Sequence, residues 1–451
     1  MPRHLAAASR HPVSALGIAL AAANAFLFLV LHGLHLLGFL QNPYIGILVF
    51  VVLPSLFGLG LLLIPLGLRL ERRRAGHASA PWPRFDLNEP EQRRAALVLA
   101  LLTLVNVVIL SMASYGAVEY SESTQFCGQT CHAAMAPEFT AHQAGPHARV
   151  SCAACHVGPG TGGLLTAKLN GTRQLWLTVV GAHSRPIPTP LERLPNVRVS
   201  CERCHSPTRF VGEKVTVRYE HADDRTNTQT RTTVRLRVGG PVLGAAGARG
   251  IHWHMDPRNA IEYIARDRLR EQIPYVRVSS GDGITREYFA AGVTAADLAD
   301  QRPRRMDCLD CHNRPAHRFG VSPERAVDAA IGEGLISPGI PFIRREAVRA
   351  LRAGYPTQDV GLAQIERSML EAISAEPRRT FDDVDLSRAI RVTQALYRDN
   401  VFPSMNIGWG SYRDQLGHTA STGCFRCHDD GHKTMNGATI RQDCDLCHTI
   451  E

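Results

Sequence analysis

The sequence is poor in aromatic residues, and it has no cysteine outside short, regular motifs. Phe, Trp and Tyr make up 6% of the 451 residues. All 12 cysteines stand in pairs that a histidine follows directly. Pairs so close and so uniform do not suit a disulfide framework. Structural zinc takes four ligands per site, and the histidine after every pair would then be a coincidence.

Five of the motifs read C-x-x-C-H, and the first reads C-x-x-x-C-H. This pattern is the attachment signal of c-type haem, in which two thiols bond the porphyrin and the adjacent imidazole lies under the iron. The sequence therefore predicts six covalent haems, numbered here in chain order, whose porphyrins supply much of the apolar interior. The predicted attachment residues and motif ligands are Cys127, Cys131 and His132; Cys152, Cys155 and His156; Cys201, Cys204 and His205; Cys308, Cys311 and His312; Cys424, Cys427 and His428; and Cys444, Cys447 and His448.

Charged residues are absent from three long stretches near the N-terminus, residues 13–40, 44–68 and 95–118. Each stretch exceeds the ~20 residues that cross a bilayer as a helix. A cleavable signal peptide has a single, shorter apolar core. The sequence therefore predicts a three-span transmembrane anchor over residues 1–118.

The placement of arginine predicts how the anchor is oriented. Arg3 and Arg10 precede the first span, and seven arginines lie between the second and third spans, whereas the connection 41–43 has no charge. By the positive-inside rule the N-terminus is cytoplasmic, and three spans then deliver the haem region to the periplasm of a bacterial inner membrane. These arginines inflate the net charge of +9, which therefore gives no indication of nucleic-acid binding.

Beyond the anchor, composition divides the chain into three regions. Residues 119–210 form a trihaem domain, and residues 211–305 form an insert without haem motifs. The insert is β-rich, because VTVRYE with TTVRLRV, and the two halves of YVRVSSGDGITREYF, alternate as hairpins do. Residues 306–451 form a C-terminal trihaem region with a helical segment, 322–400, that prolines 341, 356 and 377 interrupt. The predicted fold class is a helical membrane anchor plus an α+β periplasmic hexahaem region with little regular structure around the haems.

The run CGQTCHAAMAPEFTAHQAGPHARVSCAACHVGPG resembles the start of the NapC/NirT/NrfH family of membrane-anchored, quinol-oxidising cytochromes. The three spans, together with GIHWH, MDCLDCHNRPAH and GCFRCHDDGH, resemble the larger inner-membrane cytochromes of metal-reducing bacteria. The resemblance implies a quinol dehydrogenase that passes electrons from the membrane quinol pool to a periplasmic cytochrome or terminal reductase. Whether the chain forms a homo-oligomer or joins a larger membrane complex stays open.

The first motif departs from the family pattern C-x-x-C-H-x-M. Here one extra residue separates Cys127 from Cys131, and another separates His132 from Met135. In the family, the methionine can take the axial place of the motif histidine. The resemblance therefore implies that Met135 or His132 ligates haem 1, the expected entry haem.

The resemblance also implies a quinol site near haem 1. Lys168 matches a family lysine between the second haem and the bilayer, and residues 164–180 mix apolar side chains with Lys168 and Arg173, as interfacial helices do. The acidic residue that the family has about two turns later has no counterpart in residues 169–180. Gln174, Glu138 and His142 are the candidates for its part.

Histidines outside the motifs are the candidate distal ligands of the irons. We expect His183 and His221 to be surface or packing residues. His252 and His254 flank Trp253 and would share one face of an extended segment. His317 and His432 follow their own motif histidines so closely that we expect them to ligate neighbouring haems. The predicted distal ligands are His147, His252, His254, His317, His418 and His432.

Two other functions fit the motifs. The chain is a plain electron relay if another membrane subunit oxidises the quinol. A terminal reductase of a small oxyanion would need an open haem, and the sequence contains no C-x-x-C-K motif of the nitrite-reductase kind. In each case we expect one chain of haems leading from haem 1, nearest the lipid, to the C-terminal pair, where a soluble cytochrome would dock.

Overall fold

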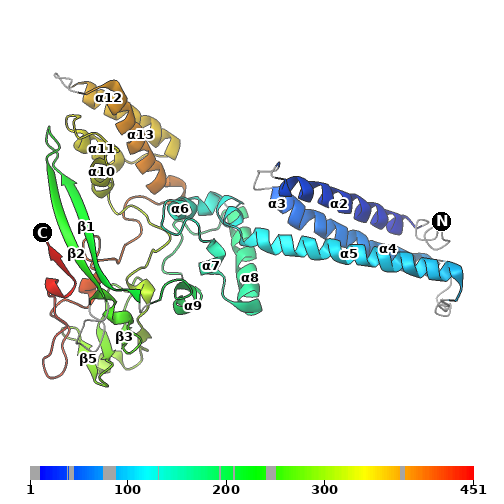
Figure 1. Ribbon diagram of the computed structural model, residues 1–451, viewed down its shortest axis with the longest axis horizontal. Helices are drawn as coiled ribbons and strands as arrows, with labels where there is room; N and C mark the ends of the chain where they lie inside the picture. Colours follow the sequence, from blue (N-terminus) through cyan, green and yellow to red (C-terminus); the bar gives the residue numbers. More distant parts are fainter. Residues whose placement is uncertain are drawn as a thin grey trace. The chain divides into compact units, whose positions relative to one another are not determined.

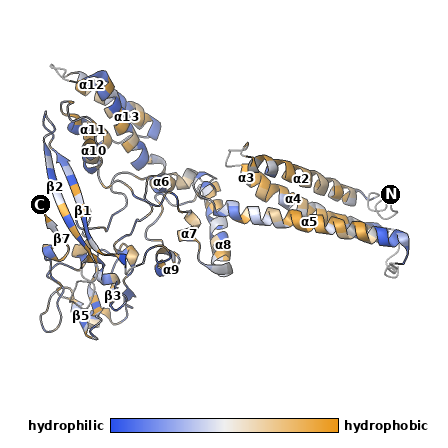
Figure 2. Ribbon diagram, viewed as in Figure 1, coloured by the Kyte–Doolittle hydropathy of each residue, from blue (hydrophilic) through white to orange (hydrophobic). Residues whose placement is uncertain are grey.

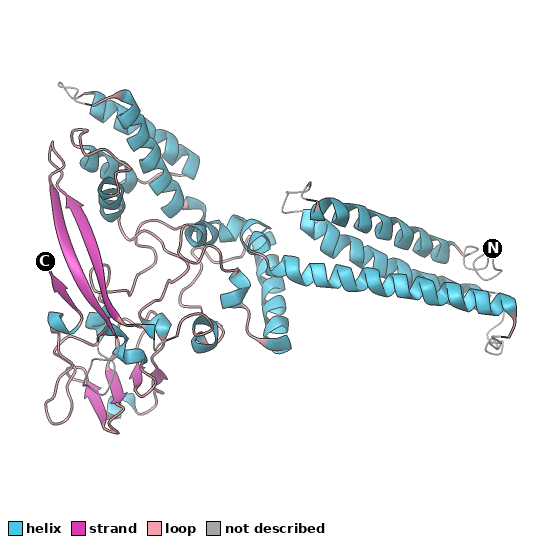
Figure 3. Cartoon of the chain, viewed as in Figure 1, coloured by secondary structure: helices cyan, strands magenta, loops and turns pink. Residues whose placement is uncertain are grey.

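The computed structural model describes residues 11–37, 39, 45–74, 88–130, 132–191, 194–206, 209–239, 250–375 and 381–451 (Figure 1). The chain divides into two compact units, Met1–His132 and Ala133–Glu451. Figure 3 shows that the first unit is helical, whereas the second mixes helices and strands. The predicted fold class, a helical anchor followed by an α+β region, is therefore confirmed.

Three helices of the first unit are long and apolar enough to cross a membrane, as predicted (Figure 2). α2 (Pro12–Leu36) provides the first span and α5 (Pro90–Glu122) the third. The second span combines α3 (Ile45–Ile47), the π-helical turn η1 (Leu48–Val52) and α4 (Leu53–Arg74). Together these spans make the chain a membrane protein.

Small residues let α2 and α4 pack with their backbones close together. An added Cβ at Gly60 would lie 2.7 Å from the Ala21 nitrogen, and one at Gly17 would lie 2.7 Å from the Gly60 carbonyl oxygen. One at Gly67 would lie 2.3 Å from the Ser14 hydroxyl oxygen. Close approach of this kind is how membrane helices gain contact area, since lipid gives them no hydrophobic drive to associate.

A long hairpin organises the first sheet of the second unit. β1 (Gly212–His221) pairs antiparallel with β2 (Gln229–Gly239), as the alternating pattern predicted. The C-terminal strand β7 (His448–Ile450) adds to β2, with His448 opposite Leu236. The sheet therefore fixes the backbone of the last haem motif.

The second sheet has the strand order β5-β4-β3-β6. β4 (Tyr275–Ser279) and β5 (Thr285–Phe289) form the second predicted hairpin, which turns through the sequence Gly-Asp-Gly. β3 (Ala260–Ile264) pairs with β4 on one side and with the short β6 (Arg304–Arg305) on the other. Because β6 comes directly before the fourth haem motif, this sheet holds that motif in place.

Four helices form the largest apolar core of the second unit. They are α10 (Pro323–Gly332), α11 (Ile343–Arg352), α12 (Gln358–Ser374) and α13 (Asp383–Asn400). The predicted breaks at prolines 341 and 356 fall between these helices, and proline 377 lies outside the described residues. The side chains of Ser322, Thr357 and Asp382 cap three of the helices by accepting backbone N–H bonds.

The tip of the long hairpin is anchored on this bundle. Asn227 donates from its side-chain amide to the carbonyl oxygens of Pro338 and Ile340, at 2.9 Å each. Near the end of β1, the buried His221 bonds Asp328 of α10, which also pairs with Arg344. His221 is therefore a packing residue, as expected.

The haem motifs lie on short turns between these larger elements, as predicted. The segments are the π-helical turn η2 (Phe126–Thr130), α6 (His132–Gln143), α7 (Cys152–His156), α9 (Val197–Cys201) and the 3-10 turns η6 (Cys308–Asp310), η8 (Gly423–Arg426) and η9 (Cys444–Leu446).

Candidate functional site

Each of the five C-x-x-C-H motifs closes a tight turn on its first cysteine. In the third, fourth and fifth motifs the histidine N–H donates to the carbonyl oxygen of that cysteine, at 2.8, 2.8 and 3.1 Å. Cys447 donates in the same way to Cys444 at 3.1 Å, and the second motif is a turn of α-helix. None of the cysteines in the described part of the chain is disulfide-bonded. Both thiols and the imidazole of each motif are thus available to one porphyrin.

The first motif accommodates its extra residue in a π-helical turn. η2 covers Cys127 and the three residues that separate it from Cys131, which itself lies outside the described residues. A π-helix closes i to i+5 bonds and so holds about one residue more per turn than an α-helix. The extra residue of the motif therefore lies within a turn that holds about one residue more than an α-helical turn.

Five histidines face the five regular motif histidines across a nearly constant gap. A metal–nitrogen bond of about 2 Å on each side, plus about 1 Å from nitrogen to ring centre, puts opposed imidazoles roughly 6 Å apart. The observed distances between ring centres are 6.1 Å for His156 and His317, 6.0 Å for His205 and His147, 6.3 Å for His312 and His252, 5.9 Å for His428 and His254, and 5.9 Å for His448 and His418.

Hydrogen bonds at Nδ1 orient four of the facing imidazoles. His317 and His252 contact the carbonyl oxygens of Glu138 and Val238, each at 2.9 Å. His147 and His254 contact the carbonyl oxygens of Pro315 and Ile251, at 3.1 and 2.9 Å. A histidine that donates from Nδ1 presents its other nitrogen as a lone pair, and this is how proteins orient metal-ligating imidazoles.

Burial keeps several of these imidazoles neutral, which metal binding requires. It lowers the pKa of His156 to about 4, with the neighbouring His317 and His142 adding to the shift. Burial also lowers the pKa of His254, of His312 and of His418. Each would accept a metal without first losing a proton near neutral pH.

His252 and His254 are supplied by a single 3-10 turn, η4 (Ile251–Met255). The segment is not extended, so the two rings do not share a face. His252 faces His312 and His254 faces His428. One turn therefore supplies a facing histidine to each of two neighbouring motifs.

His432 does not face a motif histidine in the structure, although its position in the sequence predicted a distal ligand. Its ring is 2% exposed, and both nitrogens are engaged. Nδ1 bonds Asp429 at 2.8 Å, and Nε2 bonds the carbonyl oxygen of Ile273 at 2.7 Å. This arrangement fits a structural residue that ties the fifth motif to the segment before β4.

The cysteines of the third and fourth motifs are direct neighbours. A hydrogen bond joins the Cys201 and Cys308 thiols, and it raises the pKa of Cys201 and lowers that of Cys308 to about 7. Burial raises the pKa of Cys155, and Cys152 and Cys204 add to that shift, so the second and third motifs also meet.

The later motifs follow the same order. Burial raises the pKa of Cys311 to about 12, and the nearby Cys424 adds to the shift. Burial likewise raises the pKa of Cys447, and Cys424 adds again. Each motif from the second to the fifth thus has a cysteine close enough to a cysteine of the next motif to shift a pKa.

The side chain of Arg426, inside the fifth haem motif, connects this motif to the backbone of Asp310 in the fourth. Arg426 donates to the backbone carbonyl oxygens of Asp310 and Arg270, at 2.5 and 2.9 Å. The carboxylate of Asp310 is buried, and it accepts bonds from Tyr263 and Arg270. Sequence reasoning missed this network, because variable positions of a motif give no signal of their partners.

Two of the four predicted quinol-site residues are buried among the haem motifs. Glu138 lies 3.3 Å from His317 and 3.8 Å from Arg314, and burial raises the pKa of its carboxyl group. The Nε2 of the buried His142 contacts the carbonyl oxygen of Val150 at 3.1 Å. Both residues pack around the His156–His317 pair, where they shape the surroundings of the second motif.

Lys168 and Gln174 lie on α8 (Gly160–Val179). Lys168 is half-buried and Gln174 is exposed. Alongside Lys168 runs an exposed apolar stripe of Leu165, Leu169, Trp176 and Val179 at helical spacing. A solvated helix rarely exposes such a stripe, and interfacial helices place it in lipid with lysine or arginine at its edges.

The two predicted axial ligands of the first motif, His132 and Met135, both belong to α6. His132 begins α6, and Met135 is a half-buried residue one turn later. His183 lies near Arg185, which donates to its Nε2 at 3.2 Å. The ring is half-buried and its Nδ1 is buried without a hydrogen-bond partner among the described residues, so the surface or packing role expected for His183 stays a prediction.

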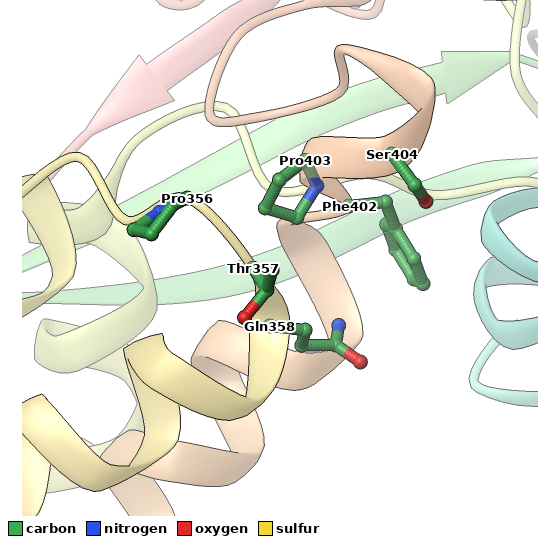
Figure 4. Close-up of a pocket in the computed structure, with 6 residues that line it drawn as sticks. All are labelled: Pro356, Thr357, Gln358, Phe402, Pro403 and Ser404. Carbon is green, nitrogen blue, oxygen red and sulfur yellow. The ribbon is translucent and has the colours of Figure 1, made fainter.

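A pocket at the base of the helical bundle offers no further redox chemistry. Its lining combines the start of α12 with the turn after α13, and Figure 4 shows the side chains around it. None of these six residues is ionisable: Pro356, Thr357, Gln358, Phe402, Pro403 and Ser404.

Comparison with known proteins agrees with these motifs. The model of the NapC/NirT cytochrome c family, N-terminal region, matches residues 89–187. The chain is 38% identical over 452 aligned residues to the cytochrome c-type protein ImcH of Geobacter sulfurreducens, covering 98% of this chain and 88% of the relative. No solved structure matches the chain.

Proposed function

Because the chain belongs to the NapC/NirT family of c-type cytochromes, we propose that it oxidises membrane quinol and passes the electrons along six covalent haems to periplasmic acceptors. The observation that carries the proposal is the set of five opposed imidazole pairs, each formed on a thiol pair, in a chain with three membrane spans. The acceptor is a soluble cytochrome or a terminal reductase.

The residues fit bis-histidine haems for the second to sixth motifs. In our assignment the motif histidine is the proximal ligand and the facing histidine is the distal one. The distal ligands of haems 2 to 6 are His317, His147, His252, His254 and His418. Two imidazoles favour electron transfer over substrate binding, because neither axial position is open. An oxyanion reductase needs a haem with an open axial position, and these histidine pairs leave none at the five motifs.

Haem 1 has a different character in this assignment. Cys127 and Cys131 attach it, and Met135 or His132 is its axial ligand. A thioether ligand is softer than imidazole and raises the reduction potential. Such a haem is suited to take the first electron from quinol.

The route for electrons follows the motif order. The sulfur neighbours Cys155 with Cys204, Cys201 with Cys308, Cys311 with Cys424 and Cys424 with Cys447 support a single line from haem 2 to haem 6. This line ends at haem 6, whose motif histidine His448 lies on the edge strand β7. Cys444 is exposed there, and a periplasmic partner would reach the porphyrin at that edge.

We assign the protein to the bacterial inner membrane, with the N-terminus in the cytoplasm and the haems in the periplasm. The arginines before and between the spans support this orientation. The exposed apolar stripe of α8 supports contact between that helix and the outer lipid interface, where Lys168 would reach a quinol headgroup.

Reduction of the purified full-length protein by a soluble menaquinol analogue, followed by haem absorbance, tests the proposal. We expect quinol to reduce several haems, and dithionite to reduce all six. If dithionite reduces the haems and quinol does not, the chain is a relay that depends on another quinol-oxidising subunit. A haem content of six per chain is the matching control for correct maturation.

A further inference from the structure

Each membrane span contributes at least one ring to a cluster at the same end of the first unit. His32 lies near the end of α2, Phe50 lies in η1 near the start of the second span, and Tyr120 lies near the end of α5. The ring centres of His32 and Phe50 are 5.5 Å apart, and those of Phe50 and Tyr120 are 6.0 Å apart. Phe28 stacks on His32 at 5.4 Å.

The cluster continues into the first haem motif. The ring of Tyr120 meets Phe126 edge-on at 5.3 Å, and Phe126 directly precedes Cys127. The Tyr120 hydroxyl bonds Thr130, within the same π-helical turn, at 3.2 Å. A series of rings therefore joins an imidazole in the first span to the attachment site of haem 1.

The absence of a side chain at two glycines leaves the space that the rings of Tyr120 and Phe50 occupy. A Cβ at Gly46 would lie 2.2 Å from Cε2 of Tyr120, and a Cβ at Gly116 would lie 2.5 Å from Cε1 of Phe50. Any larger residue at either position would displace a ring. Phe50 also lies in a π-helical turn, a rare geometry that often marks functional sites. The local backbone is thus adapted to this cluster.

Of these side chains, His32 is the one suited to accept a proton. Ionisable residues within membrane spans are costly, and they are usually functional. His32 is half-buried, whereas Phe28 and Phe50 behind it are 2% and 6% exposed. The imidazole of His32, packed against the rings of Phe28 and Phe50, offers a flat quinol ring both a stacking surface and a general base.

We propose that His32 is the proton acceptor of a quinol site formed by the ends of the three spans. Quinol gives up two electrons and two protons as it becomes quinone. One hydroxyl proton passes to His32, and the other leaves at the membrane surface, to a basic side chain there or to water. The two electrons leave one at a time to ferric c-type haem, of which the first motif is the nearest attachment site in this unit. The inference rests on the proposed function, and it places a proton acceptor inside the membrane anchor.

The test combines a binding assay with a kinetic one on the full-length, haem-loaded protein. Binding is measured as quenching of a fluorescent hydroxyquinoline N-oxide, a quinol analogue, which does not depend on turnover. His32→Gln keeps a hydrogen-bonding side chain but removes the base. It should slow haem reduction by quinol roughly a hundredfold and leave reduction by dithionite unchanged. Phe50→Leu should weaken binding of the analogue.

His11→Gln is the matched control, because His11 lies on the chain just before α2, at the other end of the same helix. It should leave both quinol reduction and analogue binding at parent values. Parent-like quinol reduction in His32→Gln would overturn the assignment of His32, even if the protein is a quinol dehydrogenase. If quinol does not reduce the unmodified protein either, the proposed function itself is wrong. Haem content and extraction from membranes show that each variant has folded.

Discussion

Arg426 of the motif CFRCH donates to the backbone carbonyl oxygen of Asp310 in the motif CLDCH. Its Nη1 also bonds the carbonyl oxygen of Arg270, and its Nε bonds that of Gly423. One guanidinium therefore joins two haem-attachment loops to each other and to the loop before β4. The planar guanidinium fixes the directions of these three bonds, whereas the single ammonium nitrogen of a lysine could not reach all three acceptors in the same geometry.

Replacing Arg426 with glutamine should lower the reduction potentials of haems 4 and 5. A half-buried positive charge stabilises an added electron, and the bonds of Arg426 also fix the spacing of the two loops. A spectroelectrochemical titration measures this, and electron paramagnetic resonance reports any change in coupling between the two haems. Arg203→Gln is the control, because Arg203 holds the same position in CERCH but is exposed, so solvent screens its charge. Equal shifts in both variants would contradict the role of Arg426.

Removing a distal histidine should change one haem alone. His418→Ala should convert one low-spin haem into a high-spin one, because its iron loses a strong axial ligand. His432→Asn is the comparison, since both of its ring nitrogens are occupied by Asp429 and Ile273. It should leave all haem spectra low-spin and lower only the stability of the fold, by about 1–3 kcal/mol for a lost buried partner. A new high-spin signal in His432→Asn would restore His432 as a ligand.

Met135→Leu should shift the potential or spin state of one haem and leave five unchanged. Leucine has a similar volume but no sulfur, so packing is kept while ligation is lost. Magnetic circular dichroism in the near infrared distinguishes methionine from histidine ligation. An unaltered spectrum would assign the axial place of haem 1 to His132.

Lys168→Ala should slow reduction by quinol on the order of tenfold or more and leave reduction by dithionite at the parent rate. Arg173→Ala is the control, since Arg173 is an exposed cation on the same helix. Loss of that charge should weaken lipid attachment slightly without changing the chemistry. If both variants are equally slow, the helix contributes membrane contact only and Lys168 accepts no proton from quinol.

Features that depend on neighbours along the chain could be predicted from the amino-acid sequence. Attachment cysteines and their histidines are set by local spacing, and the charge-free stretches by the thickness of a bilayer. The hairpins of β1 with β2 and of β4 with β5 followed from alternation, and the helical bundle from apolar periodicity and proline. All of these signals act over one turn or one strand.

Contacts between side chains that are distant in the sequence could not be predicted in this way. His418 and His432 look equivalent in the sequence, yet one faces His448 and the other bonds Asp429 and Ile273. His317 lies beyond the fourth motif but faces the second, because the chain folds back between them. Pairings of this kind depend on which distant segments can be packed together, and no periodicity in the sequence encodes that. The π-helical turns at Phe50 and Cys127 were likewise fixed by packing, since an extra residue can be absorbed wherever the surrounding contacts allow it.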